Sequence, residues 1–71
     1  MRAEDVKRFR SLLTALAESK GKQLSEAQFD LWWSAVADMP IGDFERAVQA
    51  NFRLGDRFMP SAGELRALVE G

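Results

Sequence analysis

The sequence predicts an all-α protein: a single domain over residues 1–71, folded as a compact bundle of four short helices. Three observations support this fold class. Apolar residues recur every three or four positions in four separate segments, which is the period of a helix with one buried face. No segment alternates between apolar and polar residues as a half-buried strand does. Glycine or proline stands between successive segments, and such short connections suit helices packed around one core.

The first helix is expected over residues 3–20. Gly21 follows it, and glycine commonly ends a helix because it adopts the left-handed conformation without a steric penalty. The apolar face of this helix consists of Val6, Phe9, Leu12, Leu13, Leu16 and Ala17.

The second helix is expected over residues 26–38. Ser25 and Gln28 form a capping-box pattern, in which each side chain bonds the backbone N–H of the other residue. Pro40 ends the helix, because the residue before a proline is disfavoured in the helical conformation. The apolar face consists of Phe29, Trp32, Trp33 and Val36.

The third and fourth helices are expected over residues 43–54 and 62–70. Gly42 or Asp43 can cap the third helix, and its buried stripe consists of Phe44, Ala47, Val48 and Phe52. Gly55 ends it. Phe58 and Pro60 then form an extended approach to the fourth helix, in which the phenylalanine is expected to pack. Ser61 and Glu64 make a second capping box, and the inward residues are Ala62, Leu65, Leu68 and Val69.

The composition argues against most kinds of chemistry. The chain has no histidine and no cysteine, which removes the commonest general base, the thiolate nucleophile and two common metal ligands. No glycine-rich phosphate-binding loop is present. We therefore expect a protein that is not an enzyme, with no catalytic residue, no cofactor and no metal site. No apolar run approaches the roughly 20 residues that span a bilayer, so we expect no membrane partner either.

Two tryptophans form the first candidate binding feature. Trp32 and Trp33 are adjacent, so a helix places their side chains about 100° apart. Both can belong to the core, one at its centre and one at its flank. Alternatively, Trp33 stays partly exposed and contacts a partner, since tryptophan is enriched at the energetic centres of interfaces.

Arginines form the second candidate binding feature. Arg46, Arg53, Arg57 and Arg66 gather in the C-terminal half of a chain whose net charge is only −1. Arg46 and Arg53 are seven residues apart and so share a helix face. They can form a solvated polar face, or they can bind an acidic protein surface or a phosphate path. The candidate partner-binding residues are accordingly Trp33, Arg46, Arg53 and Arg57.

The third and fourth helices could also form a helix-turn-helix that binds DNA. A recognition helix usually contacts bases with its N-terminal residues. Here the fourth helix begins Ser61-Ala62-Gly63-Glu64, which offers few side chains suited to that task.

Several of these residues recur together in one known family. Trp32, Val36, Asp38 and Pro40 give the pattern W-x3-V-x-D-x-P, and an F-x-P-S run with a following glutamate comes later, at Phe58, Pro60, Ser61 and Glu64. This order, with Phe44, Val48 and Leu65, resembles the folded N-terminal domain of the phage helicase loader and inhibitor family. It is similar in pattern to lambda-type phage replication protein P. The resemblance spans residues 29–68.

The resemblance implies a function. Members of that family bind the hexameric replicative helicase of the host, hold it inactive, and help to deliver it to the phage origin, often with an origin-binding protein. They carry no ATPase motif of their own. From the resemblance we expect a phage-type DNA replication adaptor that controls helicase loading or activity in the bacterial cytoplasm.

Two other functions remain open from the sequence. One is a small helical domain that binds DNA or regulates transcription. The other is a structural interaction domain of a larger phage protein with no role in replication. Salt-dependent affinity for duplex DNA would favour the first of these over the helicase adaptor.

Overall fold

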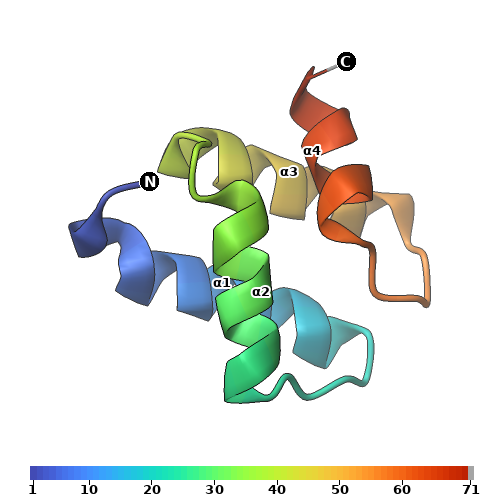
Figure 1. Cartoon of the computed structure of the whole chain (residues 1–71). Helices are drawn as coiled ribbons and strands as arrows, with labels where there is room; N and C mark the ends of the chain where they lie inside the picture. The colour runs from blue at the N-terminus through green and yellow to red at the C-terminus, as the bar shows by residue number, and fades with distance from the viewer. Residues whose placement is uncertain (71) are drawn as a thin grey trace.

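The structure, a computed structural model, describes residues 1–70. A short 3-10 turn, Ala3–Asp5, leads into four helices: α1 (Val6–Ser19), α2 (Glu26–Val36), α3 (Ile41–Leu54) and α4 (Ala62–Glu70) (Figure 1). Residues 1–70 contain no strand. The all-α fold class is therefore confirmed, and so is the number of helices.

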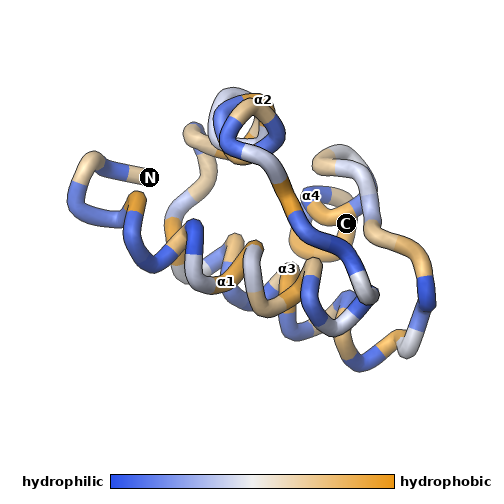
Figure 2. Tube along the Cα trace, turned by 90° about the horizontal axis from the view of Figure 1, so that it is seen from below, coloured by the Kyte–Doolittle hydropathy of each residue, from blue (hydrophilic) through white to orange (hydrophobic). Residues whose placement is uncertain are grey.

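The helices form two layers (Figures 1 and 2). α1 and α3 lie side by side in one layer, and α2 and α4 cover them from the other side. α3 is the central element because it packs against both α1 and α4, and α2 also packs against α4. The Cα trace extends 30 × 29 × 16 Å, so the molecule is flattened along one axis.

The two predicted capping boxes are both present. The hydroxyl of Ser25 accepts the backbone N–H of Gln28 at 3.2 Å, and the Gln28 side chain accepts the N–H of Ser25 at 2.8 Å. Ser61 and Glu64 make the same exchange at 3.1 and 3.4 Å. Each box satisfies N–H groups that the first turn of a helix would otherwise leave unpaired.

Glycine ends two helices, as the sequence predicts. Gly21 and Gly55 have φ of +70° and +73°, a conformation that costs other residues steric strain. After α1 the N–H of Gly21 donates to the carbonyl of Glu18, and after α3 the N–H of Gly55 donates to the carbonyl of Phe52.

The start of α3 differs from the prediction. The expected cap at Gly42 or Asp43 is wrong, because α3 already begins at Ile41 with Pro40 at the capping position. Pro40 has φ −62° and ψ 144°, and its carbonyl accepts the N–H of Phe44 at 3.1 Å. Proline suits this position because it has no backbone N–H that would need an acceptor, and because its ring fixes φ. It also follows closely on α2, which ends at Val36 rather than at residue 38.

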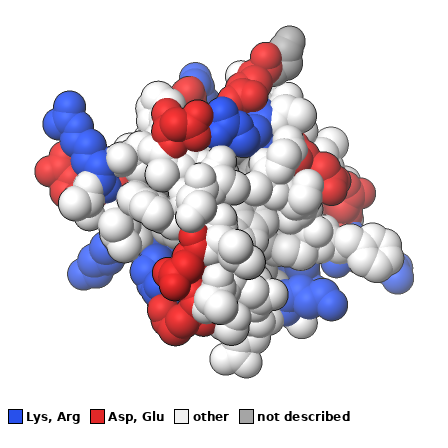
Figure 3. All heavy atoms as spheres, viewed as in Figure 1, with Lys and Arg blue, Asp and Glu red and all other residues white. Residues whose placement is uncertain are grey.

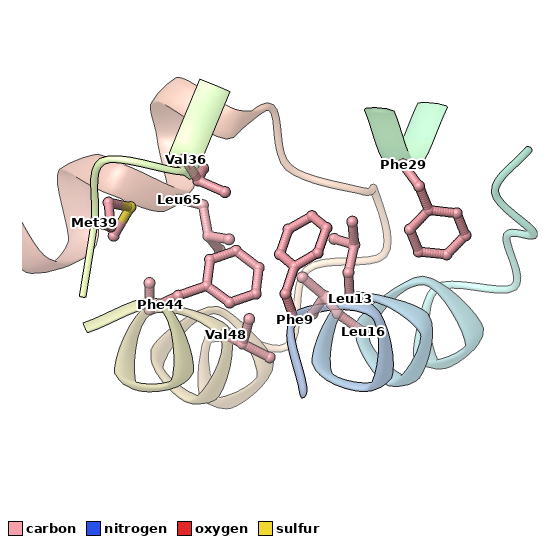
Figure 4. Packing of buried hydrophobic residues seen from close by; sticks show 10 residues of the cluster. Phe9, Leu13, Leu16, Phe29, Val36, Met39, Phe44, Val48 and Leu65 are labelled. Atoms are coloured by element: carbon pink, nitrogen blue, oxygen red, sulfur yellow. The ribbon is translucent and has the colours of Figure 1, made fainter. Parts of the chain in front are cut away.

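The core lies between the two layers (Figure 4). Phe9 of α1 and Phe44 of α3 are its largest fully buried side chains, and their ring centroids lie 5.2 Å apart. The other buried apolar residues are Leu13, Leu16, Ala17, Phe29, Val36, Met39, Ala47, Val48 and Leu65. All four helices contribute, so the domain has one shared core.

Four predicted packing residues are exposed and lie outside this core, and the first is Val6 at 38% exposure, at the start of α1. Phe52 is 62% exposed, because it stands about 80° around α3 from Phe44 and so misses the stripe that faces α1. Phe58 is 82% exposed, since the buried residue of that loop is Pro60, with Met59 half-buried beside it. Leu68 is 37% exposed, while Leu65, one turn earlier, fills the core.

Charged side chains join the helices at the surface. Arg8 of α1 pairs with Glu45 of α3 at 2.6 Å. Arg10 of α1 pairs with Glu26 of α2 at 2.7 Å, and its guanidinium carbon also lies 4.2 Å from the centroid of the Phe29 ring. These contacts link α1 to both of its neighbours, although each exposed pair contributes at most about 1 kcal/mol.

Candidate partner-binding surface

Within residues 1–70, no three Asp, Glu, His or Cys side chains are grouped so that they could hold a metal ion. No helix in the same residues combines the length and the apolar character needed to cross a bilayer. The features that remain are surface features: two tryptophans, a group of arginines, and several exposed apolar side chains.

The two tryptophans lie on either side of the buried stripe of α2. Phe29 and Val36 are seven residues apart and occupy the middle of that stripe, so the intervening tryptophans point about 50° to each side. Both are half-buried. The alternative that places one of them at the centre of the core is therefore wrong, and the partial exposure of Trp33 agrees with the other alternative.

Trp33 has a defined place between α1 and α2. Its ring meets Phe9 edge-on, with centroids 5.2 Å apart and an interplanar angle of 71°. Its outer edge lines a small groove of about 150 Å³ together with Val6 and Asp30. The contact with Phe9 helps to hold α2 on α1.

Arg46 and Arg53 line a shallow groove between α3 and α4. The groove has a volume of about 380 Å³ and is lined by Arg46, Gln49, Ala50, Arg53, Leu68 and Val69. We call it the α3–α4 groove. The two arginines are two turns apart, about 10 Å along the helix axis. Apolar side chains of α4 lie opposite them, and no carboxylate is part of the lining.

The two arginines of the groove differ in their partners. Arg46 pairs with Asp43 one turn earlier on α3, and its side chain is 70% exposed. Arg53 makes no ion pair with any carboxylate of residues 1–70. Arg53 is therefore the better placed of the two to bind an external anion.

The other two arginines lie elsewhere. Arg57 is exposed in the loop after α3 and is not part of the groove lining. Arg66 of α4 is bound within the domain. Its guanidinium donates to both carboxylate oxygens of Asp38 at 2.6 and 3.0 Å, to Glu70 at 2.7 Å, and to the carbonyl of Ala35 at 3.0 Å.

This arrangement fixes the charge state of the Arg66 cluster. The hydrogen bonds from Arg66 hold the pKa of the Asp38 carboxyl below its ordinary value, and the same bonds raise the pKa of Arg66. Because Arg66 bridges α4 to the end of α2, its role is to fasten two helices. It is not available to a partner.

The structure thus divides the predicted site residues. Arg46 and Arg53 come together in the α3–α4 groove, Trp33 lies in a separate groove against α1, and Arg57 lies in a loop. No single concave surface holds all four.

Exposed apolar side chains are the surface feature that sequence reasoning missed. Phe52, Leu54 and Phe58 are 62%, 60% and 82% exposed near the end of α3, and Leu31 of α2 is 71% exposed. Uncharged surface covers much of the face that α2 presents in Figure 3. For Phe52, helical angles counted from Phe44 would have revealed the exposure. For Phe58 there was no such signal, because a loop has no fixed period.

Comparison of the chain with models of known protein families, with curated proteins and with solved structures gives no match.

Proposed function

We propose that the domain is a phage-type DNA replication adaptor that binds the hexameric replicative helicase and controls its loading or activity. The proposal starts from the resemblance of residues 29–68 to the helicase loader and inhibitor family. The structural observation that supports it best is the α3–α4 groove, where two guanidinium groups share a lining with Leu68 and Val69.

The chemistry of the groove suits a protein partner. Arginine is enriched at the energetic centres of protein interfaces, where charge helps to select the partner, and burial of neighbouring apolar surface adds affinity. Leu68 and Val69 offer the apolar part, and the free guanidinium of Arg53 offers the charge. A helix of the helicase with an acidic edge and an apolar face would satisfy both.

The mechanism we propose is steric. The domain has one core shared by four helices, and cross-links such as Arg66 to Asp38 hold the helices in place. Such a body can occupy a surface of the helicase and exclude the ring closure or the partner contacts that activity requires. Release at the origin, in the presence of an origin-binding protein, would then restore the active helicase.

The alternative of a duplex-DNA-binding domain has less support. The exposed side chains of α4 that a recognition helix would offer include Glu64, Ala67 and Glu70. Carboxylates there would repel phosphates, and these residues offer neither the arginine–guanine contact nor the asparagine or glutamine contact with adenine. The net charge of −1 points the same way.

A pull-down tests the proposal. The tagged domain is mixed with a purified replicative helicase of a candidate host, and the double variant Arg46→Glu, Arg53→Glu is run beside it. We expect the wild type to retain the helicase and the variant to lose it. A matched control, Arg2→Glu with Lys7→Glu, makes the same change of charge at exposed positions away from the groove and should behave as wild type. Equal retention by all three proteins would argue against the groove, and no retention by any would argue against the function.

A further inference from the structure

A second surface lies at the end of α3, where aromatic and cationic side chains alternate. The chain there runs Phe52-Arg53-Leu54-Gly55-Asp56-Arg57-Phe58. We call this segment, together with Lys20, the residue after α1, the α3 tip. Phe58 is the most exposed of the large apolar side chains at 82%, and Phe52 is 62% exposed.

The exposure of two neighbouring phenylalanine rings to water is a mark of a binding surface. Exposed single apolar residues are common, but two phenylalanines and Leu54 within one short stretch are less usual. Neither ring is part of the lining of the α3–α4 groove or of the groove beside Trp33. Their faces are therefore open to a flat partner and are poorly suited to receive a helix, which needs a concave surface.

The surroundings of the rings are positively charged. Between Glu45 and Glu64 the chain has three arginines and a single acidic residue, Asp56, although the whole chain has a net charge of −1. Arg53 makes no ion pair within residues 1–70, and neither does Arg57. Each of them is adjacent in sequence to one exposed ring.

Lys20 adds a third cation from another element. Its ammonium group donates a hydrogen bond to the backbone carbonyl of Asp56, which brings the end of α1 beside the loop. Figure 3 shows Lys and Arg atoms at the lower right of the molecule, the side on which Figure 1 draws the turn after α1 and the loop after α3. The bond leaves the charge of Lys20 unneutralised, because its acceptor is a carbonyl.

We propose that the α3 tip binds single-stranded nucleic acid. Phe52 and Phe58 would stack on bases, and Arg53, Arg57 and Lys20 would contact phosphates. Open aromatic faces flanked by cations are what such binding needs, and stacking tolerates any base. Duplex nucleic acid fits poorly, because its bases are already stacked on one another and offer no free face. This site shares Arg53 with the α3–α4 groove, but Phe52, Phe58 and Arg57 lie outside the groove lining, so variants of these three residues test the site separately from the helicase contact.

The test is a titration in which the domain is added to a fluorescently labelled oligothymidylate of about 12 nucleotides. The fluorescence anisotropy of the label reports binding. We expect saturable binding. The logarithm of the association constant should fall with the logarithm of the salt concentration at a slope of about −2, because each of the three neutralised phosphates contributes about −0.7 to the slope. A duplex of the same length should compete much more weakly.

Single substitutions separate stacking from charge. Phe58→Ala should weaken binding about tenfold with little change in the salt slope, because one stacking contact is lost. Arg57→Gln should reduce the slope by about 0.7. Leu31→Ala removes an equally exposed apolar side chain on α2 and should leave binding unchanged. All of these residues are exposed, so the fold should survive, and circular dichroism melting confirms it.

Three results would overturn the proposal. One is the absence of binding at low salt. A second is binding that Phe58→Ala and Phe52→Ala leave unchanged. The third is equal competition by polyglutamate or duplex DNA, which would reveal a merely cationic surface. Because these variants leave Arg46 and the α3–α4 groove intact, helicase retention by the same variants distinguishes failure of this site from failure of the adaptor function.

Discussion

Asn51 is the one polar residue among residues 1–70 that is buried, at 5% exposure. Its side-chain oxygen accepts no hydrogen bond from the described part of the chain. A buried acceptor without a partner costs about 1–3 kcal/mol of folding free energy. Asn51 shares the inward face of α3 with Phe44 and Val48, so an apolar residue of similar shape should fit there.

We expect Asn51→Leu to stabilise the domain. Removing the unpaired oxygen and improving helix propensity should add about 1 kcal/mol, which raises Tm by about 4–8 °C in a domain of this size. Thermal melting monitored by circular dichroism measures this change in Tm. Gln49→Leu is the control for adding an apolar side chain at an exposed position of the same helix, and it should change Tm little because glutamine and leucine have similar helix propensity. A lower Tm for Asn51→Leu would mean that the amide is satisfied in solution.

The aromatic residues of α3 and its following loop test the burial pattern. Phe44 is fully buried against Phe9, whereas Phe58 is 82% exposed. We expect Phe44→Ala to cost about 3–5 kcal/mol, comparable to the whole stability of a small domain. Phe58→Ala should change stability by less than about 0.5 kcal/mol. Urea unfolding compares them, with Phe44→Leu as a milder core change if Phe44→Ala does not fold. Similar costs for Phe44→Leu and Phe58→Ala would contradict the burial pattern.

At this scale the sequence predicted most core residues and missed the exposed ones. Phe9, Leu13, Phe29, Phe44 and Leu65 follow from helical period alone. Asn51 lies seven residues after Phe44, so the helical period places it on the buried face, but its polarity argues for exposure and it was left out of the predicted stripe. The exposure of Phe58 depends on which of two adjacent loop residues turns inward, which local sequence does not determine.

At the scale of elements, local signals placed most of the boundaries. Capping boxes at Ser25 and Ser61 and left-handed glycines at 21 and 55 mark helix ends through interactions within a few residues of chain. The predicted start of α3 was wrong because Pro40 has two structural roles. It closes the turn after α2 and also supplies the first carbonyl of α3.

The ion pairs between elements should make stability depend on pH. Hydrogen bonds from Arg66 lower the pKa of Asp38 below its ordinary value of 3.8, and bonds from Arg8 lower that of Glu45 below 4.5. A carboxyl whose pKa is lower in the folded state stabilises the fold above its unfolded pKa. That contribution is lost as pH falls through the unfolded value towards the folded one.

We therefore expect the urea midpoint of the wild type to fall as the pH is lowered through about 4.5 and below. The variant Asp38→Asn, Glu45→Gln should be less stable at pH 7 and should show a shallower fall. Arg66→Gln removes the partner of Asp38, so this variant alone should lose the part of the pH dependence that Asp38 contributes. Parallel pH profiles for the wild type and the double variant would show that these pairs contribute nothing.

For the whole molecule, the fold class followed from the sequence but the arrangement of helices did not. Four amphipathic segments with short links predict a bundle. They do not determine that α1 and α3 form one layer under α2 and α4, which depends on how the side chains of Phe9, Phe44 and Leu65 fit together (Figure 4).

The same limit applies to the candidate site. Arg46 and Arg53 share a face by spacing, so their proximity was predictable. Their position opposite Leu68 and Val69 was not, because it depends on where α4 crosses α3. The separation of Trp33 from these arginines also arises from the layers, since α2 packs Trp33 against Phe9 of α1.

The proposed adaptor function depends on a contact between the helicase and the α3–α4 groove. The most direct test is isothermal titration of purified replicative helicase with the domain, with Arg46→Glu, Arg53→Glu, and with the control Arg2→Glu, Lys7→Glu. We expect saturable binding by the wild type and the control, and at least a tenfold weaker affinity, about 1.4 kcal/mol, for the groove variant. Equal affinities for the groove variant and the control, or no heat of binding for any of the three, would contradict the claim.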